Sequence, residues 1–198
     1  MSTAASRAAI LTLLAALMAA TRLHHFGAVP DASWAVFFIG GFYLSTWTRW
    51  AFPLLMALAV LVDWIVIRGQ GMDFWSHYCV SPGYWALVPA HLAMWAGGWW
   101  LQRATGGRLA WRTAGLLVAS VAVAAAACHL FAQGGFYWLS DTVADPTLAG
   151  WWKNYSDWLP AYLRVSAMYV GIAVALHAVA VRLWPAQATA LARDGARH

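Results

Sequence analysis

Apolar runs long enough to cross a lipid bilayer constrain the fold of this chain more than any other feature. A helix needs about 20 consecutive apolar residues to cross the hydrocarbon layer. Hydrophobic residues make up 63% of the 198 residues and charged residues only 10%, unlike a soluble domain. Six runs approach the required length, and the weakest is the second: 4–21, 32–48, 50–68, 82–101, 112–132 and 159–184.

These runs predict an all-α integral membrane protein with six transmembrane helices. We expect one transmembrane domain over residues 1–198, with a disordered polar tail at 185–198. The first run also resembles a signal peptide, with Arg7 before its apolar stretch. No clean A-x-A cleavage site follows it, so we expect this helix to be retained.

Positive charge is distributed unequally between the two predicted sides of the membrane. The basic residues form no stripe of the kind that binds nucleic acid, and we interpret them as topology signals. One side collects Arg7, Arg49, Arg103, Arg108, Arg112, Arg182, Arg193 and Arg197, against Arg22, Arg68, Lys153 and Arg164 on the other. Under the positive-inside rule, both termini then face the cytoplasm. The acidic residues Asp31, Asp73, Asp141, Asp145 and Asp157 fall on the outer side.

Three outer connections are longer and richer in aromatic residues than the inner ones: 22–31, 69–81 and 133–158. Connections longer than about 12–15 residues are often functional lids or linkers. The third is too aromatic for a linker, and its rings either lie at the membrane interface or line a pocket. We expect it to act as a lid over bound ligand, with Gly134, Gly135 and Gly150 as hinges.

Two ionisable residues lie inside predicted spans at matching depth. Asp63 precedes the outer end of the third helix, and Arg164 follows Pro160 in the last helix. A charge at the centre of a membrane helix costs about 2.5–3.5 kcal/mol on insertion scales, so such residues usually pair or bind something. Two interpretations stay open: a salt bridge between Asp63 and Arg164 that fixes helix packing, and a pocket floor that contacts a polar ligand.

Three of the seven histidines lie within predicted helices. His91 is near the middle of the fourth helix, His129 near the outer end of the fifth, and His177 toward the inner half of the sixth. No two of them are level, which argues against two-sided haem ligation. Each is expected to be a hydrogen-bonded core residue.

Two cysteines are too few for a disulfide framework, and their surroundings differ. Cys128 lies in an alanine-rich apolar run, whereas Cys79 lies in the polar break "WSHYCVSPGYW" on the outer side. His24, His25 and His77 are also near the outer face and could join Cys79 in a thiolate and imidazole site. The spacing matches no zinc motif such as C-x-x-C.

Two stretches, "TRLHHFGAVPDASWAVFFIGGFYL" and "SHYCVSPGYW", carry a family resemblance across six predicted spans. They resemble the BtuM family of predicted bacterial vitamin B12 transporters, which is related to the S-components of energy-coupling factor (ECF) transporters. The resemblance implies a six-helix bundle in the cytoplasmic (inner) membrane that binds cobalamin in a pocket on its outer side. It needs no cofactor of its own.

The resemblance also implies roles for particular residues. Cys79 is expected to be an axial ligand to the cobalt of cobalamin, with loss of cyanide from cyanocobalamin as a chemical consequence. His24, His25 and His77 are alternative ligands, and a protonated His77 would favour the thiolate. The candidates for further substrate contacts are Asp63, Tyr84 and Arg164. An ECF coupling module would dock on small residues of the first helix, at Ala15 with Ala19 and Ala16 with Ala20.

Other classes of function compete with this interpretation. A nickel or cobalt ion transporter of the same superfamily is disfavoured, because the chain begins "MSTA" without a histidine at the second position. A membrane thiol enzyme of the sortase type would use Cys79 as nucleophile with Arg164 and a histidine. A haem or quinone protein would use the helix histidines. The chain has no G-x-x-x-x-G-K-[ST] motif, so energy for transport must come from a partner or a gradient.

Overall fold

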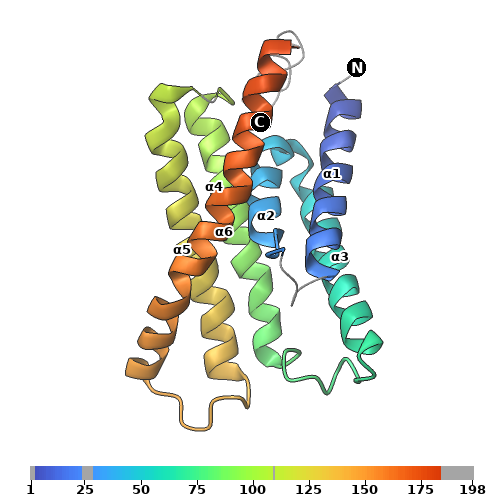
Figure 1. The fold of residues 1–198 in the computed structure, drawn as a ribbon, viewed down its shortest axis with the longest axis vertical. Coiled ribbons are helices and arrows are strands. Elements are labelled where there is room, and N and C mark those ends of the chain that lie inside the picture. The colour runs from blue at the N-terminus through green and yellow to red at the C-terminus, as the bar shows by residue number, and fades with distance from the viewer. Residues whose placement is uncertain (1–2, 24–28, 109, 184–198) are drawn as a thin grey trace.

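A computed structural model describes residues 3–23, 29–108 and 110–183, and the regular secondary structure within these ranges is all helical (Figure 1). Three short 3₁₀ helices join or precede the longer ones: η1 (Ser45–Trp47), η2 (Pro82–Ala86) and η3 (Trp111–Thr113). The α-helices are α1 (Thr3–Leu23), α2 (Ser33–Tyr43), α3 (Thr48–Gly69), α4 (Leu87–Thr105), α5 (Ala114–Leu139) and α6 (Leu148–Leu183). The predicted all-α architecture is confirmed.

Four helical stretches in the described part of the chain are long and apolar enough to cross a membrane. They are Ala4–Leu23, Ser45–Gly69, Trp111–Leu139 and Leu148–Leu183. Helices of this length and composition are compatible with a multi-pass membrane protein. The six spans expected from the sequence include two further helices, α2 and α4, which do not meet the same criterion.

The helix expected at 32–48 is shorter than a span and forms the centre of the bundle. α2 has 11 residues, and all but Trp34 and Tyr43 are buried. Its backbone lies against α4, because glycines stand where the two helices cross. A Cβ on Gly98 would lie 1.9 Å from the carbonyl oxygen of Phe38, and one on Gly41 would lie 2.0 Å from that of Trp95. Such contacts are shorter than any side chain allows, so the crossing requires glycine.

The 133–158 segment, expected to be a loop, is mostly helical. α5 continues to Leu139 and α6 already begins at Leu148, so the connection covers only 140–147. Gly134 and Gly135 therefore lie inside α5, and Gly150 lies in the first turn of α6. The extension of α6 is amphipathic: Tyr155 is buried, whereas Trp152, Lys153 and Asp157 are exposed. Polar residues on one face of a helix end an apolar run without ending the helix.

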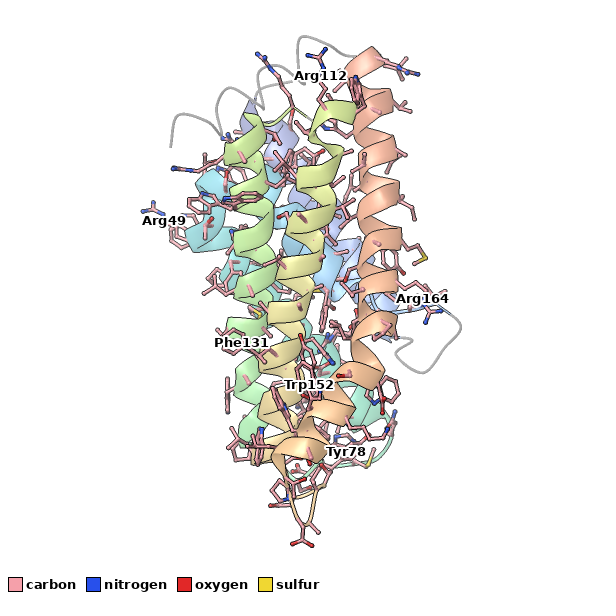
Figure 2. The ribbon with its side chains drawn as sticks, turned by 90° about the vertical axis from the view of Figure 1, so that its left-hand side faces the viewer. Arg49, Tyr78, Arg112, Phe131, Trp152 and Arg164 are labelled. Atoms are coloured by element: carbon pink, nitrogen blue, oxygen red, sulfur yellow. The ribbon has the colours of Figure 1, made fainter. Side chains whose placement is uncertain are left out.

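The two ends of the bundle differ in what they carry. The start of α1 and the end of α6 lie at the same end of the bundle, together with the connection between α4 and α5 (Figure 1). Arg49 and Arg112 are toward this end, and Tyr78 is at the opposite end (Figure 2). The 70–81 and 140–147 connections share that opposite end, which we call the loop end. The expected tail at 185–198 lies outside the described residues.

Candidate functional site

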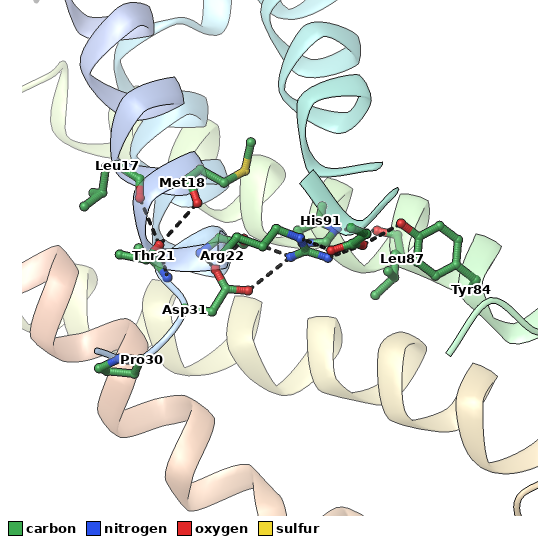
Figure 3. Close-up of polar contacts among 12 residues, drawn as sticks. Leu17, Met18, Thr21, Arg22, Pro30, Asp31, Tyr84, Leu87 and His91 are labelled. Carbon is green, nitrogen blue, oxygen red and sulfur yellow. Dashed lines mark hydrogen bonds and ion pairs between the residues drawn. The ribbon is translucent and has the colours of Figure 1, made fainter. Parts of the chain in front are cut away.

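Arg22, at the end of α1, organises a partly buried network of charged groups (Figure 3). Its Nε and Nη2 donate to the two carboxylate oxygens of Asp63, at 2.6 and 2.7 Å. Its Nη1 donates to Asp31 Oδ2 and to Ser33 Oγ, both at 3.1 Å. A two-pronged contact between guanidinium and carboxylate is among the strongest polar interactions in proteins. The network therefore joins the end of α1 to α3 and to the start of α2.

Tyr84 extends this network to the segment that follows the cysteine loop. Its hydroxyl donates to Asp63 Oδ2 at 2.6 Å. The side chains of Arg22 and Asp63 are only 11% and 18% exposed, so both charges are largely removed from solvent. We call Arg22, Asp31, Ser33, Asp63 and Tyr84 the Arg22 cluster. With one guanidinium and two carboxylates, its formal charge is negative.

The predicted salt bridge between Asp63 and Arg164 is wrong. Asp63 pairs with Arg22, and Arg164 is exposed with its side chain directed away from the helices (Figure 2). Arg164 makes no ion pair with any described residue. Equal depth along two helices says nothing about the direction in which each side chain points, which is why the inference failed. The sequence alone indicates only a topology signal at Arg22.

A cleft of about 450 Å³ opens beside the Arg22 cluster. Tyr84 belongs to both. The rings of Trp34 and Tyr162 stack in its wall, with centroids 4.4 Å apart. No Asp, Glu, Lys or Arg is among the residues that line it: Trp34, Gly83, Tyr84, Leu87, His129, Ala132, Gln133, Phe136, Asn154, Trp158 and Tyr162. The cleft is thus aromatic with a few neutral polar groups.

Two glycines allow close packing where η2 crosses α5, next to this cleft. A Cβ on Gly83 would lie 2.2 Å from the carbonyl oxygen of Gly135, and one on Gly135 would lie 2.3 Å from the Cβ of Ala86. A Cβ on Gly150 would meet the Tyr137 hydroxyl at 2.5 Å. Close packing explains Gly83, Gly135 and Gly150. The three expected hinges, Gly134, Gly135 and Gly150, lie within α5 and α6 rather than in a long loop.

The helix histidines are hydrogen-bonded inside the bundle. His91 Nδ1 donates to the Leu87 carbonyl at 2.7 Å, and its buried Nε2 has no partner among the described residues. His91 lines a second, smaller cavity of about 130 Å³, together with Arg22 and Tyr84. This agrees with the expectation of a hydrogen-bonded core residue.

The other two helix histidines each form a hydrogen bond with a residue of another helix. His129 Nε2 donates to the Tyr155 carbonyl at 3.1 Å, and His177 Nδ1 contacts the Tyr43 hydroxyl at 2.7 Å. Across the described ranges, no group of three or more His, Cys, Asp or Glu side chains is placed to hold a metal ion.

Cys79 lies in the 70–81 connection, which leads directly into η2 and the cleft. Its thiol is half-buried and forms no disulfide. Cys128 is also a free cysteine, and it is fully buried. Burial raises the pKa of the Cys79 thiol. A hydrogen bond with the Tyr78 side chain opposes this, and the negative charge of Asp63 adds to it. The thiol is therefore mostly protonated at neutral pH.

His77 lies beside this thiol in the same connection. The backbone N–H of Cys79 donates to His77 Nδ1 at 3.2 Å. His24 and His25 lie outside the described residues. On α1, Ala16 and Ala20 are exposed, and Ala15 and Ala19 are half-buried.

Sequence comparisons do not place the chain in a family. A scan of protein-family models gives no match, and a search of curated proteins gives no significant match.

Proposed function

We propose that this chain binds cobalamin at its loop end, on the outer side of a bacterial cytoplasmic membrane, and carries it inward. The choice of cobalamin as the ligand rests on the family resemblance. The observation that supports it is the position of Cys79, a free thiol in the connection that leads into an aromatic cleft. The excess of arginine at the end opposite to that loop supports the orientation.

The cleft has the chemistry that a corrinoid needs. A corrin is a broad, amide-rimmed ring, which suits aromatic walls with a few neutral hydrogen-bonding groups. The volume of about 450 Å³ is too small for the whole molecule. Binding therefore requires the 70–81 and 140–147 connections to move apart, and the proposed lid consists of these two segments rather than 133–158.

Cys79 supplies the axial ligand in this proposal. Sulfur loses its proton to solvent when it binds cobalt, because coordination favours the thiolate. The thiolate occupies the face that the nucleotide base otherwise holds, so cobalamin binds in its base-off form. In cyanocobalamin, the cyanide opposite sulfur leaves as an anion with both bonding electrons. Cobalt keeps its oxidation state, so no reductant is needed.

The other candidate substrate contacts differ in how close they lie to the cleft. Tyr84 lines the cleft, and its hydroxyl donates a hydrogen bond to Asp63, so the pair holds one wall in place. His77 stays an alternative ligand to Cys79 because it adjoins it in the same connection. Arg164 is not part of the proposed site, since it faces away from it.

Energy for uptake is proposed to come from an ECF coupling module. The exposed alanines of α1, Ala16 and Ala20, offer small residues for helix-to-helix docking. A sortase-like enzyme is less well supported. The side chain of its candidate arginine, Arg164, points away from the helices, and His77 Nδ1 accepts a hydrogen bond from the Cys79 backbone.

A growth assay tests the uptake. A cobalamin-auxotrophic strain that lacks its own inner-membrane importer should grow on nanomolar cobalamin when it expresses this chain. The Cys128→Ala variant, which removes the thiol outside the proposed site, should also support growth. Absence of growth with a chain that is present in the membrane, in strains with and without an ECF module, would contradict the proposal.

A further inference from the structure

Two amide side chains meet in the wall of the cleft. Gln133 on α5 and Asn154 on α6 both line it, and Gln133 Nε2 donates to Asn154 Oδ1 at 2.8 Å. This contact joins the two helices at the level of the aromatic walls. The contact leaves the carbonyl oxygen of Gln133 and the NH₂ group of Asn154 for other partners.

The pair leaves an unused acceptor. Gln133 Oε1 is buried and accepts no hydrogen bond from any described residue. A buried acceptor without a partner is unfavourable, so a donor is needed there. The inference does not depend on how the amides are turned. Either orientation uses one N–H and one oxygen between them, and leaves one carbonyl oxygen and one NH₂ group.

The rest of the cleft offers no partner for a charged ligand group. None of its lining residues is Lys, Arg, Asp or Glu. The proton on His129 Nε2 already goes to the Tyr155 carbonyl. A free carboxylate entering the cleft would lose its hydration without gaining a cation, which is strongly unfavourable.

We infer that Gln133 and Asn154 recognise a primary carboxamide on the ligand and make the cleft selective against free carboxylates. The ligand amide donates to Gln133 Oε1 and accepts from the NH₂ group of Asn154. A carboxylate can accept but cannot donate, so it leaves Gln133 Oε1 unpaired. This inference rests on the proposed corrinoid function and deepens it, because corrinoids carry such amides around the ring.

The test compares two ligands that differ only in these groups. Titration calorimetry at pH 7 measures the affinity of the purified full chain for cobinamide, and for the same corrinoid with its amides hydrolysed to carboxylates. The amide form should bind about tenfold more tightly or better. Equal affinities for the two forms would overturn the inference while leaving the proposed function standing. If neither form binds, both the proposed function and this inference are wrong.

Variants separate amide recognition from general damage. Gln133→Leu and Asn154→Leu should weaken binding of the amide form and reduce the preference for it several-fold. Gln102→Leu is the matched control, because this buried glutamine of α4 is not among the residues that line the cleft. An unchanged preference in both cleft variants would overturn the inference. If the leucine variants do not fold, the comparison of ligands on the unmodified chain still decides.

Discussion

Arg22 and Asp63 lie on different helices, 41 positions apart in sequence, yet their guanidinium and carboxylate groups meet in a two-pronged contact. Tyr84 binds the same carboxylate, so the contact also holds the segment that follows Cys79. The charges that secure the end of α1 thus also position one wall of the cleft. A change at Arg22 should therefore affect both stability and ligand binding.

Removing one partner of this pair should destabilise the fold strongly. Arg22→Met leaves the two carboxylates of the cluster without their cation, and we expect a loss of about 3 kcal/mol in the free energy of unfolding. Arg22→Met combined with Asp63→Leu should cost less than the sum of the single changes. Unfolding in detergent by denaturant or heat measures these values.

Two matched arginine and lysine variants complete this experiment. Arg164→Met should combine additively with Asp63→Leu, because the two side chains do not interact. Lys153→Met removes an exposed pair with Asp157 and should change stability by less than about 1 kcal/mol. A coupling between Asp63 and Arg164 larger than that between Asp63 and Arg22 would contradict the structure.

The crossing of α2 and α4 should not tolerate a side chain. In Gly98→Ala the new methyl group meets the Phe38 carbonyl, so the helices must separate, and we expect a loss of about 1–3 kcal/mol or more. Gly171→Ala on α6 has open space around its Cβ and should be neutral or slightly stabilising. Equal melting temperatures for the two variants would show that the helices are not in contact at this point.

The sequence predicts the helical class because apolar composition and run length depend on local chemistry alone. The same criterion misjudged 133–158, since Lys153 and Asp157 interrupt an apolar run but remain on the exposed face of a helix. It also assigned too long a helix at 32–48, where η1 and the start of α3 replace the last turns. Continuous hydrophobicity does not show where a helix ends.

Within the candidate site, the sequence identified Asp63 and Tyr84 but missed Arg22 and the Gln133 to Asn154 pair. An arginine at the end of an apolar run is usually a topology signal, so only its three-dimensional partners distinguish Arg22 from Arg68 or Arg164. A useful signal was present nonetheless. Asp31 and Ser33 follow Arg22 closely, at the start of a strongly apolar helix. Neutral amides such as Gln133 give no comparable signal.

The reactivity of Cys79 should rise with pH later than that of an ordinary thiol. Because burial and Asp63 raise the pKa of this thiol, alkylation by iodoacetamide should be slow at pH 7 and reach half its maximal rate at a higher pH than alkylation of N-acetylcysteine measured in parallel. The Cys128→Ala background ensures that only one thiol reacts. Asp63→Asn should lower the midpoint, since it removes a negative charge. A midpoint below that of N-acetylcysteine would contradict the described surroundings of the thiol.

The proposed orientation makes Cys79 accessible from outside the cell. A membrane-impermeant maleimide should label it in intact spheroplasts of the Cys128→Ala strain, at a pH high enough for the thiol to react. A cysteine introduced at Arg112, at the opposite end of the bundle, should react only after lysis. The reverse pattern would invert the topology and the direction of transport with it.

The absorption spectrum of bound cobalamin tests the central claim most directly. The purified chain mixed with aquocobalamin should shift the corrin bands to those of a base-off, sulfur-ligated cobalt, and Cys79→Ser should abolish that shift and weaken binding at least about tenfold. Cys128→Ala should preserve both. A Cys79→Ser protein that is folded, binds cobalamin with unchanged affinity and gives the unchanged spectrum would contradict cobalt ligation by Cys79.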